Sequence, residues 1–419
     1  MTVLGLDDTD SRERGMCTTY VGYSVASALR DRGARVRQLG LLRLNPAVEH
    51  KTRGNAAIAV HTDADTAVAF ETGRAVLSDL AVTDDERTQP GMVVAPEPVE
   101  SRVASFSRRA VRELLDLEEA IEIIDTVNYE RFGLDGGRGQ IGALAAVGAH
   151  LAFDDWTYEY IAYRKPDAWG TPRAVEEASV FEAADEYYPD AWDTVDRGEG
   201  EAVCVPNAPG PILYGIRGDD PVAVAGVAAG IESEPVHGQA LFVTNQGTDA
   251  HLQEASLGSV TEDSAFRVTG TVVEAPETRP GGHVFLTVGD GDHRLRCVAF
   301  EPTKRFRTHV RSLRVGDVVT VAGEVTDETL KLEKFAVRSL ETTKLEPPDC
   351  PDCGNRMESA GAGQGYRCRD CKTRADSKVE RPISRDLETG WYEVPPCARR
   401  HIAKPLIRGG FDGPVHPER

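Results

Sequence analysis

Three carboxylates stand within four positions near the start of the chain, directly after an apolar run. Residues 3–6 suit a buried strand, and Asp7, Asp8 and Asp10 follow it. Carboxylates this close repel one another, and a bound cation relieves that repulsion. Magnesium on a nucleotide triphosphate fits, because it needs only one or two carboxylates and takes its other ligands from phosphate and water. The segment therefore predicts a Mg²⁺–ATP site, with a plain acidic turn as the alternative.

The next residues favour phosphate as well. Gly15 opens a run, residues 17–29, that reads as a helix, and Thr18 and Thr19 lie at its N-terminus. Free backbone N–H groups and the helix dipole attract anions there. Thr18 can also be only an N-capping residue.

Two later segments also suit phosphate. Lys51 and Arg53 lie between two expected strands, 37–44 and 56–61. The ammonium of Lys can bind phosphate as a point charge, and the guanidinium of Arg can donate two parallel hydrogen bonds to it. Gly136, Gly137, Arg138 and Gly139 open a helix of small residues, an arrangement that exposes backbone N–H groups. A solvated hairpin loop and a tight turn before a close-packed helix are the structural alternatives.

Four cysteines give the strongest local pattern. Cys350, Cys353, Cys368 and Cys371 form C-x2-C-x14-C-x2-C. Each C-x2-C turn supplies two thiolates, and tetrahedral zinc needs four. We expect a structural Zn²⁺ without which this small module has no core. The other four cysteines are scattered along the chain, which fits reduced thiols better than disulfides.

Net charge does not decide the partners of this chain. The formal charge is −20, from 48 basic and 68 acidic residues, and only nine of the basic residues are Lys. Acidic residues spread through every segment are typical of a salt-adapted surface. At multimolar salt the Debye length is ~3 Å or less, so phosphate binding rests on close hydrogen bonds and stacking.

The element pattern predicts a multidomain α+β protein. The four expected units are an N-terminal α/β kinase-like domain at 1–150, a ferredoxin-like domain at 151–262, an OB-fold β-barrel at 263–342 and a C-terminal zinc ribbon with a basic tail at 343–419. Helices are expected at 65–79, 99–118, 175–187 and 221–231, and middle-unit strands at 155–164, 202–205 and 240–244. No run approaches 18 apolar residues and no apolar leader is present, so we expect a soluble, cytoplasmic protein with no membrane partner.

Basic residues stand out in the last two units. Lys304, Arg305 and Arg307 lie in a helix-like insert between the third and fourth barrel strands, and Arg399, Arg400, His401 and Lys404 lie in the tail. On an OB barrel such a cluster favours nucleic-acid binding over a solvated helix face.

Taken in order, these segments resemble the archaeal tRNA(Ile) 2-agmatinylcytidine synthetase (TiaS) family over the whole chain. The residues that carry the resemblance are the segments 5–11, 15–20, 43–46, 51–55, 133–142 and 244–251, the zinc knuckles, and residues 398–401. The resemblance implies an ATP-dependent ligase that joins agmatine to carbon 2 of the wobble cytidine in the isoleucine tRNA that decodes AUA. In that family ATP is cleaved to AMP, the base oxygen is activated by phosphorylation, and a threonine matching Thr18 is itself phosphorylated.

The resemblance also implies roles for single residues. Asp7, Asp8 and Asp10 hold Mg²⁺ and, with Thr18, form the catalytic set, while Thr9, Ser11, Lys51, Arg53 and the glycine loop contact ATP. Asp249, with Asn245, is the candidate for agmatine, whose guanidinium needs a carboxylate. The tRNA is expected to be held at its anticodon and acceptor regions, with the wobble base extruded from the stack. The oligomeric state is left open.

Two other classes of protein compete with this interpretation. A non-catalytic RNA-binding adaptor explains the barrel and zinc ribbon but leaves the aspartate loop without a purpose, and it predicts no magnesium-dependent ATP turnover. A DNA-acting OB and zinc-ribbon enzyme predicts a preference for single-stranded DNA over tRNA.

Overall fold

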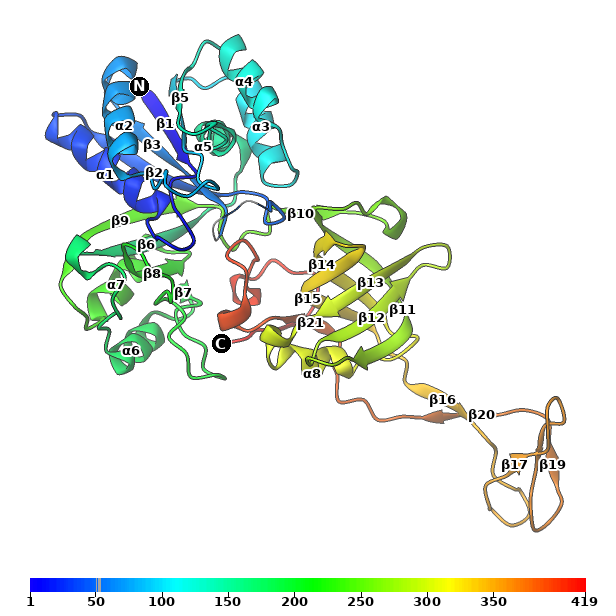
Figure 1. Ribbon diagram of the computed structural model, residues 1–419. Coiled ribbons are helices and arrows are strands. Elements are labelled where there is room, and N and C mark those ends of the chain that lie inside the picture. The colour runs from blue at the N-terminus through cyan, green and yellow to red at the C-terminus, as the bar shows by residue number, and fades with distance from the viewer. Residues whose placement is uncertain (50, 52–53) are drawn as a thin grey trace.

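The structure is a computed structural model that describes residues 1–49, 51 and 54–419. The first two units share one nine-stranded sheet, with the strand order β5-β4-β1-β3-β2-β9-β6-β8-β7. All its pairings are antiparallel except β2 with β9, which are parallel and align Leu41 with Thr244. Figure 1 shows this sheet passing from the blue N-terminal unit into the green middle unit. The two units are therefore joined by backbone hydrogen bonds.

The described residues of the N-terminal unit form five strands and five helices. They are β1 (Thr2–Asp7), α1 (Thr18–Asp31), β2 (Val36–Arg43), β3 (Ala56–Thr62), α2 (Thr66–Leu80), β4 (Gly91–Pro96), α3 (Ser101–Ala110), α4 (Leu117–Thr126), β5 (Glu130–Gly133) and α5 (Gln140–Ala152).

Strand β1 is central and buried on both faces. Val3 packs into the cluster beneath α3 and α5, whereas Leu4 and Leu6 pack into the cluster beneath α1 and α2. This follows the two-residue period of a strand. A Cβ at Gly5 would lie 2.0 Å from the carbonyl oxygen of Ala143 in α5, so only glycine lets the helix lie this close. Tight packing on both faces fixes where the aspartates after β1 lie.

The predicted helix at 99–118 is divided in two. Helix α3 ends at Ala110 and α4 begins at Leu117. The carbonyl of Ala110 accepts the backbone N–H of Asn45 at 2.9 Å, and the residues between the helices include Leu114 and Leu115, which line the pocket described below. The end of α3 therefore contacts the 44–49 loop. Helical periodicity does not predict this break, because the contact joins residues far apart in the sequence.

The middle unit is an antiparallel sheet with two helices, as expected for a ferredoxin-like sandwich. Its elements are β6 (Thr157–Arg164), η1 (Pro166–Ala168), α6 (Glu177–Tyr187), β7 (Ala191–Trp192), β8 (Ile212–Gly218), α7 (Pro221–Gly230) and β9 (Val236–Thr244). The predicted strand at 202–205 is wrong: these residues form turns, and the strand lies at β8 instead. Cys204 is held there by Thr194 and Gly215 through backbone hydrogen bonds.

The third unit is a closed five-stranded barrel. Its elements, with the short strand that leads into it, are β10 (Leu252–Glu254), η2 (Leu257–Ser259), β11 (Ser264–Thr278), β12 (Val284–Gly289), β13 (Arg294–Ala299), η3 (Glu301–Thr303), α8 (Phe306–Arg311), β14 (Val318–Thr326) and β15 (Thr329–Ser339). The parallel β13–β15 pairing and the antiparallel β14–β11 pairing close it. Helix α8 fills the place predicted for the insert.

The zinc module stands apart from the barrel. Strands β16 (Thr343–Glu346) and β20 (Val379–Pro382) pair as a two-stranded arm, and β17 (Glu358–Ser359), β18 (Tyr366–Arg367) and β19 (Arg374–Ala375) form the small sheet at its end. The chain then returns through β21 (Gly390–Glu393), η4 (Pro396–Ala398), η5 (Leu406–Arg408) and β22 (Val415–His416). In Figure 1 this red segment lies between the barrel and the middle unit.

The predicted fold class is confirmed, whereas the unit boundaries at 150, 262 and 342 stay predictions. Within the described part of the chain, none of the helices is both long and apolar enough for a membrane span.

Candidate active site

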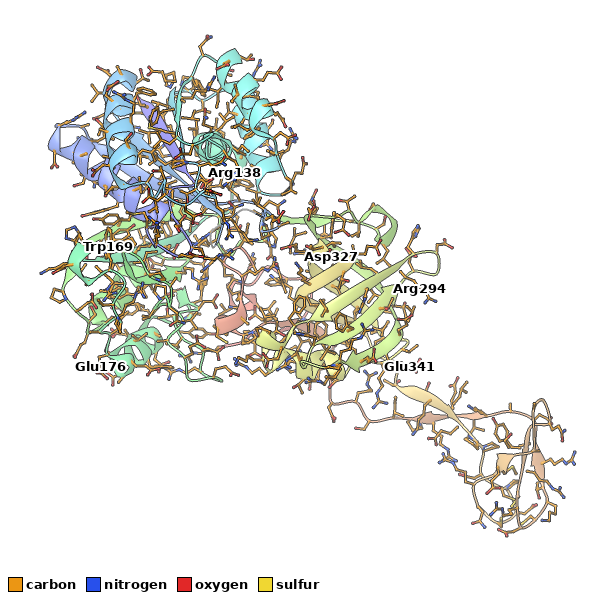
Figure 2. The ribbon with its side chains drawn as sticks, in the orientation of Figure 1. Arg138, Trp169, Glu176, Arg294, Asp327 and Glu341 are labelled. Atoms are coloured by element: carbon orange, nitrogen blue, oxygen red, sulfur yellow. The ribbon has the colours of Figure 1, made fainter. Side chains whose placement is uncertain are left out.

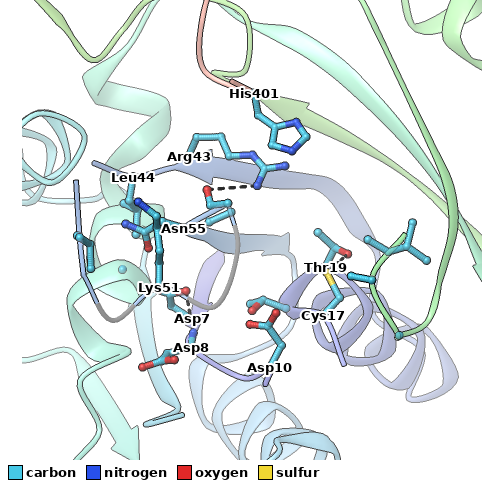
Figure 3. A pocket seen from close by; sticks show the side chains of 18 of the residues that line it. Asp7, Asp8, Asp10, Cys17, Thr19, Arg43, Leu44, Lys51, Asn55 and His401 are labelled. Atoms are coloured by element: carbon cyan, nitrogen blue, oxygen red, sulfur yellow. Dashed lines mark hydrogen bonds between the residues drawn. The ribbon is translucent and has the colours of Figure 1, made fainter. Parts of the chain in front are cut away.

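A pocket of about 480 Å³ lies between the N-terminal and middle units. One wall carries Asp7, Asp8, Asp10, Thr18, Arg138 and Gly139, and the other carries Glu159, Ile161, Gly215 and Arg217. Figure 3 shows the three aspartates at one end, with Arg43 and His401 at the other. The continuous sheet brings the walls together, since Arg43 ends β2 and Glu159 and Arg217 face each other across β6 and β8.

The aspartate loop combines burial, like charge and backbone strain. The Oδ1 atom of Asp7 accepts the Asp8 backbone N–H at 2.7 Å, and Arg138 donates to Oδ2 of Asp8 at 2.7 Å. Asp8 has φ 58°, a left-handed conformation that costs free energy for most non-glycine residues and that Asp adopts more readily than most. Burial, followed by the Asp8 charge, raises the pKa of Asp7 well above its ordinary value. The pKa of Asp8 is raised by burial against the opposing effect of Arg138.

Helix α5 sets the position of Asp7 through two glycines. A Cβ at Gly142 would lie 1.9 Å from Oδ2 of Asp7, and a Cβ at Gly139 would lie 2.5 Å from its carbonyl oxygen. The start of the helix therefore packs directly on the carboxylate. Arg138, at this end of α5, extends toward the junction of the units (Figure 2).

The predicted phosphate-binding glycine loop is used differently from our expectation. The backbone N–H groups of Gly137, Gly139 and Gln140 donate to carbonyls of Leu134, Gln89 and Gly137. Gly139 and Arg138 line the pocket, but Gly136 and Gly137 do not belong to its lining. The structural alternative, a tight turn before a close-packed helix, describes most of this loop.

Thr18 lies beside the aspartates, and its hydroxyl accepts a hydrogen bond from Thr9 at 3.1 Å. Both threonines are buried. Ser11 instead donates to Asp85 at 2.6 Å, and its hydroxyl caps the turn at Glu13 and Arg14, so it shapes the loop. Thr18 and Thr19 both line the pocket at the N-terminus of α1.

Lys51 reaches the pocket, whereas Arg53 lies outside the described residues, so its prediction remains open. The ammonium of Lys51 donates to the Pro46 carbonyl. Burial is the main cause that lowers the pKa of Lys51.

The two residues predicted for agmatine have structural partners. Both carboxylate oxygens of Asp249 accept hydrogen bonds from Nζ of Lys334, at 2.8 and 2.7 Å, and Asp249 does not belong to the pocket lining. The side chain of Asn245 bonds the backbone N–H and carbonyl of Arg43, at 2.7 and 3.0 Å. Asp249 thus joins the middle unit to the barrel, and Asn245 fixes the end of β2. These contacts do not support a direct role in binding agmatine.

The predicted RNA-binding residues near the barrel are largely paired within the protein. Arg305 contacts Asp196 at 2.9 Å and Glu418 at 2.5 Å, and Lys304 lies 3.6 Å from Glu199. Arg307 donates to the Gly282 carbonyl at 2.8 Å.

Most of the basic residues predicted in the tail are also paired with other groups of the protein. Arg399 is buried with Asp193 and Glu393, and Arg400 pairs with Glu324, whose pKa it lowers to about 2 against the effect of burial. The ammonium of Lys404 lies 5.7 Å from the Phe411 ring. His401 differs from these, because it lines the pocket. The tail is therefore mainly a connection between units, and direct RNA contact by these residues stays a prediction.

Arg43, Glu159 and Arg217 line the pocket and had no predicted role. Glu159 accepts a hydrogen bond from Gln246 and lies 3.8 Å from Nη2 of Arg43. These residues come from three separate strands, so no spacing in the sequence brings them together. The available signal was the presence of charged residues inside strands, Glu159 with Arg164 in β6 and Arg217 in β8.

The four predicted zinc ligands converge. The sulfur atoms of Cys350, Cys353, Cys368 and Cys371 all lie within 4.8 Å of one another, and no other such group of potential ligands occurs among the described residues. Sulfurs bound tetrahedrally at ~2.3 Å from zinc must lie ~3.8 Å apart. Cys353 and Cys368 are 3.6 Å apart, so the residues fit Zn²⁺.

Sequence models of known domains match nearly the whole chain. Residues 3–63 and 61–136 match the TiaS TCKD domain, and residues 137–251 match the TiaS FLD domain. An OB-fold nucleic acid binding domain matches residues 266–334, and the TiaS C-terminal zinc ribbon domain matches residues 347–387.

Whole proteins agree with these matches. The isoleucine-tRNA 2-agmatinylcytidine synthetase TiaS of Haloquadratum walsbyi is 54% identical, with 100% of both chains covered, and that of Methanosarcina mazei is 45% identical, with 97% of both covered. The structure of TiaS in complex with its isoleucine tRNA and ATP matches with a TM-score of 0.91 at 41% identity, covering 100% of this chain and 99% of that one. That of TiaS with the same tRNA, AMPCPP and agmatine gives 0.88 at 38% identity, with the same coverage. With such identity along its full length, the chain belongs to the TiaS family of isoleucine-tRNA 2-agmatinylcytidine synthetases.

Proposed function

We propose that this protein joins agmatine to carbon 2 of the wobble cytidine of the AUA-decoding isoleucine tRNA at the expense of ATP. The observation that carries the proposal is the pocket, which places a half-buried aspartate loop and the buried Thr18 opposite a polar wall of the middle unit. It occurs in a chain that matches full-length relatives solved with tRNA, ATP and agmatine. A non-catalytic adaptor has no need for a half-buried, mutually repelling set of carboxylates.

The reaction requires an activated base. The carbonyl carbon of cytosine is a poor electrophile, and phosphorylation of its oxygen converts that oxygen into a leaving group. Attack by the agmatine amine then forms the C2–N bond, breaks the C2–O bond and releases phosphate, while the amine loses a proton. Because a free amine of this type has a pKa of ~10.4, a base must accept that proton. One of the pocket carboxylates that does not bind the magnesium ion, or a phosphate oxygen, would take this proton.

Asp7, Asp8 and Asp10 would hold the magnesium ion that accompanies ATP. The donor set suits a hard cation, because three half-buried aspartates line one end of the pocket. Their carboxylates do not converge as the thiols of the ribbon do, so one or two of them would bind the ion, with phosphate and water as its other ligands. When bound, Mg²⁺ would neutralise phosphate charge. Arg138 holds Asp8 in place, and Thr18 is proposed as the residue that takes up a phosphoryl group, as the family resemblance implies. Lys51, at the pocket, is proposed to contact phosphate.

The structural Zn²⁺ belongs to the ribbon, away from the pocket. We propose that the barrel and ribbon hold the tRNA from outside while the wobble base enters the pocket, and that the protein acts in the cytoplasm, where its tRNA substrate is found.

The direct test is transfer of radiolabelled agmatine to an isoleucine tRNA transcript, with ATP and Mg²⁺ in concentrated potassium chloride. We expect label in the tRNA, and none when the wobble cytidine is replaced by uridine. If a folded, zinc-loaded protein binds the transcript but transfers no label, the ligase proposal is wrong and the adaptor is favoured.

A further inference from the structure

Arg217 is an unusual side chain of the pocket wall. It lies on β8, is only 5% exposed and lines the pocket. Among the described residues its guanidinium makes no hydrogen bond, and its Nη1 atom is buried without an acceptor. The nearest carboxylate oxygen, Oδ2 of Asp193, lies 3.9 Å away and is itself buried without a hydrogen-bond partner among the described residues, while the other oxygen of Asp193 contacts Arg399. A buried guanidinium with unused donors carries a large desolvation cost, so an acceptor is expected.

Arg43 presents a second incompletely bonded guanidinium to the same pocket. Its Nη2 atom donates to Gln246 at 3.0 Å, while its buried Nε atom has no partner among the described residues. Burial lowers the pKa of Arg43, and the Arg217 charge adds to this effect while Glu159 opposes it. The positive charge of Arg217 therefore disfavours the charged form of Arg43, and the carboxylate of Glu159 offsets this effect.

The surroundings preserve this arrangement. A Cβ at Gly54 would lie 2.4 Å from Nη1 of Arg43, and a Cβ at Gly215 would lie 2.9 Å from Oε1 of Glu159. His401 also lines this part of the pocket, and its pKa is lowered well below the ordinary value by burial and then by Arg43 and Arg217. A neutral imidazole can share a hydrogen bond there without adding charge.

Free guanidinium N–H groups select a particular ligand. Phosphate oxygens accept from arginine in a forked geometry, whereas the guanidinium of agmatine would be repelled by two arginines. We propose that Arg217, together with Arg43, forms a phosphate-binding site on the wall opposite the aspartate loop. Resting on the proposed function, this site would hold either a phosphate of ATP origin or a phosphodiester of the tRNA next to the extruded base.

The test compares Arg217→Met and Arg217→Lys with the wild type and with Arg74→Met, an exposed arginine of α2 paired with Glu71 as the matched control. Dissociation constants are measured separately for ATP with Mg²⁺ and for the tRNA transcript, and the thermal unfolding midpoint is recorded. Loss of a charge-assisted hydrogen bond to phosphate corresponds to a weakening of about tenfold or more. We expect such a loss in Arg217→Met, partial recovery in Arg217→Lys and no change in Arg74→Met.

The two sources of phosphate give different results. Weaker ATP binding with unchanged tRNA binding assigns the site to ATP, and the reverse assigns it to the tRNA backbone. If both constants are unchanged while the unfolding midpoint falls, Arg217 is only the structural partner of Asp193 and the proposal is wrong. It is equally wrong if only the dissociation constant of agmatine, measured in the same way, rises. These readouts do not need product formation, so failure of the ligase assay on the wild type would leave them interpretable.

Discussion

At the scale of single residues, the site contains a carboxyl group and a backbone conformation that each cost free energy of folding. Asp7 is a buried carboxylate with a raised pKa beside Asp8, which itself has a strained backbone. Such features lower stability, and they persist where function requires them. They also make the site testable by solution measurements that do not depend on product.

The first prediction concerns the pH dependence of stability. The folded-state pKa of Asp7 is raised, so the unfolded chain releases this proton at lower pH than the folded chain does. The free energy of unfolding therefore falls as pH rises from the ordinary aspartate value of about 3.9 through the raised value. In magnesium-free buffer we expect Asp7→Asn to unfold at a higher temperature than wild type near pH 7, with the difference vanishing below about pH 4.

Thermal denaturation followed by circular dichroism at several pH values measures this effect. Asp65→Asn, an exposed residue before α2, is the matched control and should not change the profile. Asp7→Asn should also lose ligase activity. An unfolding midpoint equal to wild type at every pH would contradict a raised pKa of Asp7 in the folded protein.

The second prediction concerns Thr18. Replacement by valine keeps the shape and removes the hydroxyl, which costs about 1 kcal/mol for the lost hydrogen bond with Thr9. We expect Thr18→Val to fold and bind tRNA normally but to form at least a hundredfold less product, because the proposed phosphoryl acceptor is absent. Thr126→Val, at the exposed end of α4, is the control, since its hydroxyl bonds only its own helix at Glu122. Wild-type product formation by Thr18→Val would exclude the role.

At the scale of elements, the sequence pattern predicted most single helices and strands, but it did not predict features that several elements form together. Strand β1 and helices α1, α2, α6 and α7 lie within a few residues of their predicted places, because alternation and helical periodicity report burial directly. Strand β8 was missed, and three amides of the glycine loop, those of Gly137, Gly139 and Gln140, bond the chain itself, so phosphate binding by this loop stays a prediction. The wall formed by Arg43, Glu159 and Arg217 depends on the order of strands in the sheet, which periodicity does not encode.

The roles of charged residues in the connections between units also depend on assembly. A basic residue in an acidic chain suggests RNA, and Arg399, one of the residues predicted to bind it, is buried against Asp193 of the middle unit. Composition cannot show whether a cation faces solvent or a carboxylate of another unit.

The third prediction separates these roles at Asp249. Removing one member of a buried ion pair leaves the other uncompensated, at a cost of roughly 3–5 kcal/mol. We expect Asp249→Asn to lower the unfolding midpoint clearly while the agmatine KM of the folded enzyme is unchanged. The double variant Asp249→Asn with Lys334→Met should recover part of the stability. A higher agmatine KM without loss of stability would favour the sequence-based assignment of Asp249 over the structural one.

At the scale of the whole molecule, the pocket and the zinc module are built as separate parts. The first two units, the barrel and the returning tail are tied together by a shared sheet and by buried ion pairs. The ribbon extends from the barrel on the β16–β20 arm (Figure 1). Its folding depends on four thiolates and their metal, since its buried cluster contains little besides Cys350, Met357 and Cys368.

The last prediction follows from this separation. Removing zinc with a chelator should unfold the ribbon alone, because its cysteines do not belong to the lining of the pocket and its buried cluster is separate from the cluster beneath α1 and α2. We expect ATP binding and the main unfolding transition to stay as in the zinc-loaded protein, while the transfer of agmatine to tRNA is lost. Cys353→Ser with Cys371→Ser should behave like the chelated protein, and Cys297→Ser, a buried barrel residue outside the ribbon, should retain zinc. If ATP binding fell together with zinc content, the ribbon would have to stabilise the pocket, and the two parts could not be treated as independent.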